Sequence, residues 1–174
     1  MENAVLKNLQ ERRSIRKYLP KQVDEEQLQA ILQAGMFAPT GRGLQSPVMI
    51  VVQDQEVREK LRKMNASVMG NPDMDPFYGA PTIIVVLADK TVSTCVEDGS
   101  LVMGNLMNAA YSVGVDSCWI QRAREEFESE EGKALLKEWG VEGDYIGIGH
   151  CILGYRDCES PVARERKANY IYRV

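Results

Sequence analysis

Apolar residues recur along the chain with two different periods, and these periods predict its helices and strands. Apolar residues at helical spacing predict helices over residues 3–12, 24–35, 54–64, 94–114 and 129–139. Short apolar runs predict strands over residues 48–53, 82–89, 116–120, 145–155 and 169–174. The segment 70–81 is rich in Gly, Pro and Asp and predicts a loop.

Two of these helices carry sequence signals for their first turns. Asp24 with Gln27, and Thr94 with Glu97, have the spacing of a capping box. The helix over 94–114 is apolar around most of its circumference, which is typical of a helix buried in a core or an interface. We therefore expect part of this helix to lie between two subunits.

The order of the elements favours the α+β class. Helices and strands do not alternate as regular β-α-β units. The glycines of the strand over 145–155 precede no helix, so they are not a dinucleotide fingerprint. We expect one domain over residues 1–174. Its last strand, over 169–174, needs a pairing partner to be stable.

Composition and charge exclude several classes of protein. The formal net charge of −4 argues against a general nucleic-acid or anionic-membrane binder. No apolar run approaches the ~18 residues of a membrane span, and no signal peptide is visible. The four cysteines form no C-x-x-C pair, so we expect reduced thiols and a cytoplasmic protein.

The single histidine, His150, argues against a zinc enzyme and excludes sites with several histidine ligands. It lies in an apolar run, where we expect a buried and hydrogen-bonded strand residue. Cys118 and Cys151 also lie in apolar strands, and we expect them in the core. The sequence predicts no metal site.

Two basic clusters are the first candidates for a binding site. The segment ERRSIRKY contains Arg12, Arg13, Ser14 and Arg16, and guanidinium groups with a hydroxyl suit a phosphate. A solvated basic turn after a helix is the competing interpretation. The second cluster, ARERK at 163–167, precedes the last strand. Convergence of both clusters on one phosphate is a hypothesis that their spacing alone does not prove.

Two further segments complete the set of candidates. The loop FAPTGRGLQSP at 37–47 combines glycines and prolines, which lets a flat ligand approach the backbone, although many helix-to-strand loops look alike. The segment DSCWIQRA at 116–123 changes from strand to loop. Taken in order, RRSIRKY, APTGRGLQSP, GAPTIIVV, NLMNAAYSVG, CWIQRA and the basic tail make the chain resemble the FMN-dependent nitroreductase family over essentially its whole length.

The resemblance implies a mixed β-sheet flanked by helices, an interlocked homodimer, and FMN at the dimer interface in contact with both chains. The first basic cluster matches the phosphate and ribityl segment, the loop at 39–41 matches one lent by the partner subunit, and the tail matches a second phosphate cluster. The residues implied in cofactor binding are Arg12, Arg13, Ser14, Arg16, Pro39, Thr40, Gly41, Gln45, Gln121, Arg122, Arg164, Arg166 and Lys167. Gln45 matches a polar ribityl or ring contact, and Gln121 and Arg122 match the segment whose backbone faces flavin N5.

The function implied is that of an oxidoreductase in which NADH or NADPH gives a hydride to flavin N5 and an electron-poor acceptor, a nitroaromatic or quinone, then takes it in a ping-pong cycle. The cofactor carries the chemistry, so no catalytic side-chain acid or base is expected. Arg16 is the candidate cation for the N1/O2 edge of the ring. Three alternatives stay open: related flavin chemistry such as reductive dehalogenation or flavin breakdown, a flavin carrier or sensor without turnover, and a nucleic-acid binder built on RRSIRK.

Two departures from the family pattern matter. Gly43 stands where the family often has asparagine, which puts one ring contact in doubt. The segment 65–81 is short where larger relatives place insertions that cover the substrate, so an open pocket is expected. The sequence names neither the physiological acceptor nor the preferred nicotinamide.

Overall fold

A four-stranded antiparallel sheet forms the centre of the molecule in the computed structural model, which describes residues 1–174. The strands are β1 (Pro47–Val52), β2 (Thr82–Asp89), β3 (Asp116–Ile120) and β4 (Tyr145–Gly154). They are ordered β1-β2-β4-β3, and all three strand pairs are antiparallel. The resemblance had implied a mixed sheet, but the only parallel pairing is the isolated bridge between Ser14 and Ser117.

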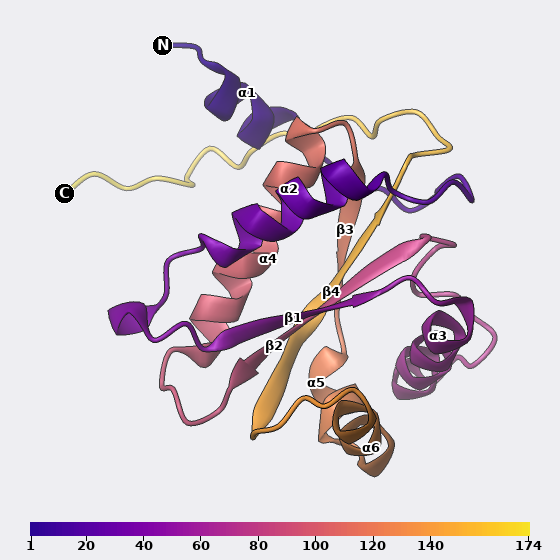
Figure 1. Cartoon of the computed structure of the whole chain (residues 1–174). Coiled ribbons are helices and arrows are strands. Elements are labelled where there is room, and N and C mark those ends of the chain that lie inside the picture. The colour runs from indigo at the N-terminus through magenta and orange to yellow at the C-terminus, as the bar shows by residue number, and fades with distance from the viewer.

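Helices cover both faces of this sheet (Figure 1). They are α1 (Ala4–Glu11), α2 (Glu25–Met36), α3 (Gln55–Met69), α4 (Cys95–Ser112), α5 (Ala123–Glu128) and α6 (Glu130–Glu138). The residues of α2 and α4 share one apolar core, and those of α3, α5 and α6 share the other. None of the helices combines the length and apolar character needed to cross a bilayer.

The strand β2 shows why the sheet lies between two layers. Its side chains alternate between the two cores, with Ile83, Val85 and Leu87 on one side and Ile84, Val86 and Ala88 on the other. All six are fully buried. A strand covered on both faces reads as a continuous apolar run, which is the pattern that the sequence shows at 82–89.

Most expected elements are confirmed within a few residues of their bounds, but one helix was missed and two expected side-chain caps are wrong. The helix α5 was not predicted. Neither Asp24 nor Thr94 caps its helix with its side chain, although both occupy the N-cap position. The amide of Gln27 instead donates to the carbonyl of Val113, at 2.6 Å, and the Thr94 hydroxyl turns to the side chain of Asp98.

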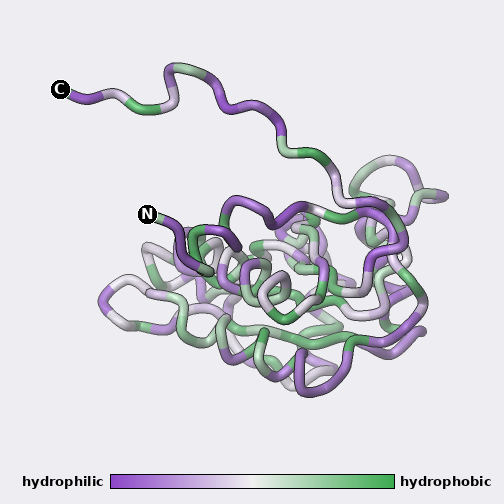
Figure 2. The backbone as a smooth tube through the Cα atoms, turned by 90° about the horizontal axis from the view of Figure 1, so that it is seen from above, coloured by the Kyte–Doolittle hydropathy of each residue, from purple (hydrophilic) through white to green (hydrophobic).

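The strand expected over 169–174 is also wrong for the single chain. Residues 157–174 are exposed and contain no strand, and Figure 2 shows this tail standing clear of the body. The free edge of β3 is occupied by the segment around Ser14, where the Ile15 N–H donates to the Ser117 carbonyl at 3.0 Å. The tail pairs with no strand of its own chain, and the edge of β3 is already taken by the segment around Ser14.

Candidate functional site

The first basic cluster lies along the start of β3. The Ser14–Ser117 bridge and the Ile15–Ser117 hydrogen bond hold this segment against the strand. Burial raises the pKa of the Cys118 thiol, while the charges of Arg16 and Arg12 and a hydrogen bond with Ser14 oppose that rise. The three polar side chains therefore converge on the surroundings of one buried residue of β3.

Arg12 and Arg16 have unpaired donors, whereas Arg13 is partly occupied: its Nη1 donates to two carbonyls, while its buried Nε has no partner. Arg12 Nη1 is buried and has no hydrogen-bond partner. Arg16 is exposed to solvent. Arg13 donates to the carbonyls of Gln10 and Arg12, at 2.6 and 2.8 Å, at the end of α1. Arg13 thus stabilises the helix end, where carbonyls lack helical partners and a cation is favourable.

The segment Gln121–Arg122 lies at the other end of β3, beside a pocket of about 460 Å³. Arg122 has a φ of 80°, in the left-handed region that costs a non-glycine residue free energy. The pocket has a mainly apolar floor from the sheet and a wall from the start of α4. Its lining residues are Val96, Ser100, Trp119, Gln121, Arg122, Arg124, Glu125, Ile146, Gly147 and Ile148.

Buried polar atoms without partners are concentrated along this line. They include Arg12 Nη1 and Arg13 Nε in the segment beside the start of β3, and Ser117 Oγ and Trp119 Nε1 on the strand itself; the remaining three, on Glu126 and His150, lie elsewhere. Such groups normally find a partner, so a cluster of them marks a candidate ligand site. Ser117 and Gln121 are roughly 13 Å apart, at about 3.3 Å per strand residue. A phosphate at the cationic end and a flat ring in the pocket fit this length and donor set.

The loop from Pro39 to Gln45 is anchored to α4 through Asp98. Its carboxylate accepts hydrogen bonds from Gly41 N and Ser46 Oγ, both at 2.8 Å, and from Thr94 Oγ1 at 3.2 Å. Burial raises the pKa of Asp98, but the hydrogen bonds from Gly41, Ser46 and Thr94 outweigh burial and leave the pKa below its ordinary value. The ionised carboxylate of Asp98 therefore holds this loop against α4.

Within one chain this loop does not line the pocket at the end of β3. Val96 and Ser100 of α4 face the pocket, whereas Asp98 lies about half a turn away from both and faces the loop. The backbone is strained here, because Arg42 and Gln45 have φ values of 55° and 53°. Gly43 has a φ of 68°, so the residue that departs from the family pattern occupies a position that favours glycine.

The structure does not bring the second basic cluster to the first. Arg164, Arg166 and Lys167 lie in the exposed tail. The only interaction of these cations is that of Lys167, whose Nζ is 5.3 Å from the centre of the Tyr170 ring. Their convergence with Arg12 and Arg16 stays a prediction.

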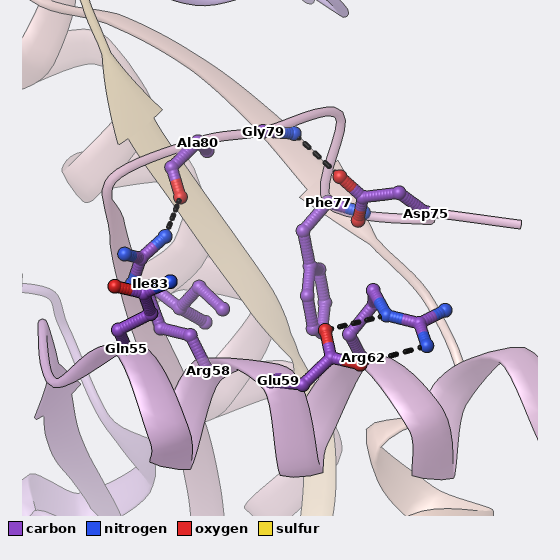
Figure 3. Close-up of a pocket in the computed structure, with 9 residues that line it drawn as sticks. All are labelled: Gln55, Arg58, Glu59, Arg62, Asp75, Phe77, Gly79, Ala80 and Ile83. Carbon is purple, nitrogen blue, oxygen red and sulfur yellow. Dashed lines mark hydrogen bonds and ion pairs between the residues drawn. The ribbon is translucent and has the colours of Figure 1, made fainter. Parts of the chain in front are cut away.

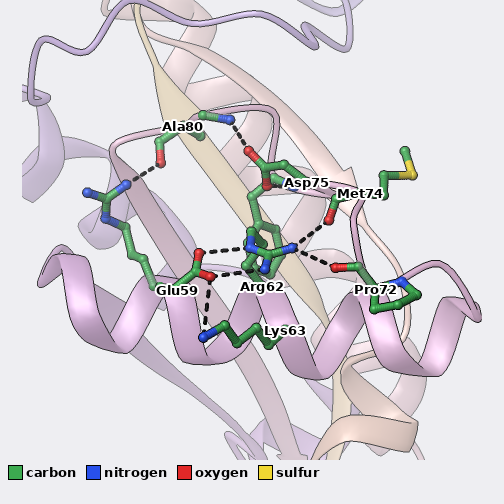
Figure 4. A network of polar contacts seen from close by, with 10 residues as sticks. Glu59, Arg62, Lys63, Pro72, Met74, Asp75 and Ala80 are labelled. Atoms are coloured by element: carbon green, nitrogen blue, oxygen red, sulfur yellow. Dashed lines mark hydrogen bonds and ion pairs between the residues drawn. The ribbon is translucent and has the colours of Figure 1, made fainter.

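A second pocket, of about 280 Å³, lies between α3 and the loop 70–81 (Figure 3). Its arginines are already paired. Arg62 binds both carboxylate oxygens of Glu59 and donates to the carbonyls of Pro72 and Met74 (Figure 4). Arg58 donates to the Ala80 carbonyl at 3.1 Å. These contacts hold the loop on α3, and the paired groups leave β3 as the better ligand site.

Sequence reasoning missed three residues of the site. Asp98 anchors the loop, Trp119 lines the pocket, and Asn65 donates to the Gln121 carbonyl at 2.8 Å. Both polar residues carried a signal. Asp98 precedes Val102 by four residues and Asn65 follows Leu61 by four, so each is a polar residue on the buried stripe of a helix.

The fold and site together define a small α+β protein with a cationic segment at one end of β3 and a pocket at the other. The sequence model of the nitroreductase family matches residues 9–155. A protein of Archaeoglobus fulgidus, provisionally named NADH dehydrogenase/NAD(P)H nitroreductase, is 34% identical over 155 residues, which cover 86% of this chain and 84% of the relative. The chain belongs to the nitroreductase family, which confirms the resemblance seen in the sequence.

Solved structures agree with this assignment. A nitroreductase with bound FMN from Bacteroides fragilis superimposes with a TM-score of 0.88 at 28% identity, covering 99% of this chain and 100% of that one. A second FMN-bound nitroreductase, from Desulfitobacterium hafniense, gives a TM-score of 0.88 at 26% identity over the full length of both chains. The α+β fold with a helix-flanked sheet is therefore that of solved nitroreductases.

Proposed function

We propose that this chain is an FMN-dependent oxidoreductase that takes a hydride from NADH or NADPH and passes it to an electron-poor acceptor, a nitroaromatic or a quinone, in a ping-pong cycle. The observation that carries the proposal is the line of unpartnered buried donors along β3, from Arg12 Nη1 to Trp119 Nε1. The FMN in the related structures and the names of the curated relatives support the same reading. Bound FMN would supply the hydride acceptor and donor.

The residues of this chain would bind and orient the cofactor. Arg12, Ser14 and Arg16 would hold the phosphate, since charged donors at a strand edge suit a dianion. Ile146, Ile148 and Trp119 would form the surface on which the ring lies. Arg122 would present its backbone N–H, which donates to no backbone atom of the chain. No step requires a side-chain acid or base.

The remaining predicted contacts belong to the same proposal. Arg13 would support the phosphate site through the end of α1, and Pro39, Thr40, Gly41 and Gln45 would reach the ring of a second subunit. The tail residues Arg164, Arg166 and Lys167 would close on the phosphate in the assembled protein. We propose a single FMN-binding domain over 1–174 in a cytoplasmic protein.

The assembly we propose is an interlocked homodimer. A groove of about 700 Å³ between α1 and α4 is lined in part by Val5 and Ala109. Large apolar side chains are exposed on α1, at the end of α2 and on α4. They are Val5, Leu6, Leu9, Met36, Phe37 and Leu101. A second copy would cover this surface, and its loop at 39–45 would complete the flavin site. Obligate interfaces of this kind bury on the order of 2,000–5,000 Å².

Anaerobic spectroscopy of the purified protein tests the activity. The protein as isolated, or after reconstitution with FMN, is expected to show a flavin spectrum that bleaches on addition of NADH or NADPH and returns on addition of a quinone. A bound flavin that neither nicotinamide bleaches would indicate a carrier and contradict the proposed turnover. The nicotinamide that bleaches faster identifies the preferred co-substrate.

A further inference from the structure

A chain of buried polar side chains runs from β4 to the segment after β3. Asn65 and His150 are fully buried, and Glu126 is 1% exposed. The amide of Asn65 donates to the Gln121 carbonyl, at 2.8 Å, and to Glu126 Oε1. On its other side, Glu126 Oε2 lies 3.2 Å from His150 Nε2.

The orientation of the Asn65 amide is fixed by these acceptors. A carboxylate and a carbonyl both accept only, so the nitrogen of the amide must face them. The amide oxygen is then left for Arg122, whose Nη1 lies 3.4 Å away. One side chain of α3 therefore contacts both residues of the Gln121–Arg122 peptide.

Because that peptide is planar, the contact between Asn65 and the Gln121 carbonyl also fixes the direction of the Arg122 N–H. The chain has no cis peptide bond, and in a trans peptide the carbonyl and the next N–H point in opposite directions. Asn65 belongs to α3, on one face of the sheet, whereas the pocket lies between Val96 and Ser100 of α4, on the other face, and the start of α5 at the sheet's end. Drawing the Gln121 carbonyl toward α3 therefore aims the free Arg122 N–H toward the pocket.

We infer that Asn65, itself oriented by Glu126, is a positioning residue that aims the Arg122 N–H into the cofactor pocket. The inference rests on the proposed function, because it concerns the orientation of that site. It also accounts for the left-handed φ of 80° at Arg122, which the hydrogen bond to Asn65 holds in place. Arg62, one turn before Asn65 on α3, donates to the Met74 carbonyl and so holds the loop 70–81 on the same helix (Figure 4).

Variants of the two side chains separate orientation from stability. In N65D/E126Q the hydrogen bond between positions 65 and 126 is kept with its direction reversed, and the number of buried carboxylates is unchanged. Only the Gln121 carbonyl loses its donor. In E126Q alone, the glutamine oxygen still accepts from Asn65, so the Gln121 hydrogen bond is kept. N71D is the matched control, because Asn71 is exposed and lies just beyond α3.

The first measurement uses protein without cofactor. The ¹⁵N chemical shift of the Arg122 amide responds to hydrogen bonding at the preceding carbonyl, so it is expected to move in N65D/E126Q and to stay near the wild-type value in E126Q and N71D. N65A, which introduces no charge, is expected to move it as well and serves if the double variant does not fold. An unchanged Arg122 shift in a folded N65D/E126Q or N65A protein overturns the inference even if the chain binds no flavin.

The second measurement uses the FMN-loaded protein. For N65D/E126Q we expect kcat to fall by about tenfold or more, as for a misplaced preorganised donor, with the visible absorbance band of FMN shifted. FMN affinity and the nicotinamide KM should change by less than about threefold, because the phosphate site lies at the far end of β3. E126Q should lose no more than about threefold in kcat. A double variant with the kcat and spectrum of the wild type would contradict the inference. A loss of FMN affinity by more than tenfold would also contradict it, because Asn65 would then serve to retain FMN rather than to orient the Arg122 N–H.

Discussion

Replacement of Asp98 by alanine is expected to destabilise the protein through the loop that it anchors. The side chain is 2% exposed and accepts three hydrogen bonds, from Gly41, Ser46 and Thr94. Ser46 is itself 5% exposed, so its hydroxyl would be left without water or a partner. The Gly41 N–H is only half-buried and would be partly rescued by solvent.

The size of the effect follows from these exposures. An unsatisfied buried hydroxyl costs about 1–3 kcal/mol, and a partly buried N–H costs less, so Asp98→Ala should lower the free energy of unfolding by about 3 kcal/mol. Asp54 is the matched control, because it also accepts a backbone N–H, from Val57 at 3.0 Å, but at an exposed helix N-cap. Asp54→Ala should cost about 1 kcal/mol.

Urea unfolding followed by far-ultraviolet circular dichroism measures both variants under the same conditions. Equal losses for Asp98→Ala and Asp54→Ala would refute the anchoring role of Asp98. The pH dependence gives a second check with a fixed sign. A carboxylate with a lowered pKa stabilises the folded state above its ordinary pKa of about 3.9 and loses that contribution as the pH falls through the lower folded-state pKa. The difference in stability between the wild type and Asp98→Asn should therefore be constant from neutral pH to about pH 5 and shrink below pH 4.

Three further predictions concern the cofactor site and the assembly. Arg16→Ala should weaken FMN binding by ~1.5–3 kcal/mol, and Arg122→Ala should weaken it less, because we propose that Arg122 contacts the ring through its backbone. Fluorescence titration that gives the reverse order would contradict the cofactor placement. Deletion of 164–174 should lower both FMN content and dimer stability, and analytical ultracentrifugation of a stable, flavin-loaded wild-type monomer would contradict the shared site. Gly149→Ala places a Cβ 2.5 Å from Trp119 Nε1. It should therefore displace the indole and lower the free energy of unfolding by about 1–3 kcal/mol, measured by thermal unfolding. An unchanged melting temperature with unchanged FMN affinity would show that the indole has room to move.

The elements that the sequence predicted well are those whose pattern is strong and local. The run at 82–89 is apolar on both faces and became the central strand β2, with the predicted bounds. The helix α5 was missed because it has only six residues and two apolar side chains, Ala123 and Phe127, which are too few to show a period. The strand order β1-β2-β4-β3 has no signature in the sequence, since it depends on contacts between distant segments.

The residues of the candidate site also fall into those that the sequence revealed and those that only the fold reveals. The segments at 12–16 and 121–122 were found by their residue types and order, and the structure places them at the two ends of β3. Asn65 and Asp98 act through hydrogen bonds to residues 56 and 57 positions away along the chain, and only the fold brings these partners together. The tail differs again, because the partner that we propose for it belongs to a second subunit, so its strand cannot form in a single chain.

Calorimetric titration of the cofactor-free protein with FMN and with riboflavin tests the central claim most directly, because the two ligands share the ring and differ by the phosphate. We expect one FMN to bind per chain and riboflavin to bind more weakly by about 3 kcal/mol or more, the contribution of two charged contacts from Arg12 and Arg16. In Arg16→Ala the difference between the two ligands should shrink. Equal affinity for FMN and riboflavin, or no binding of either, would contradict the site described along β3.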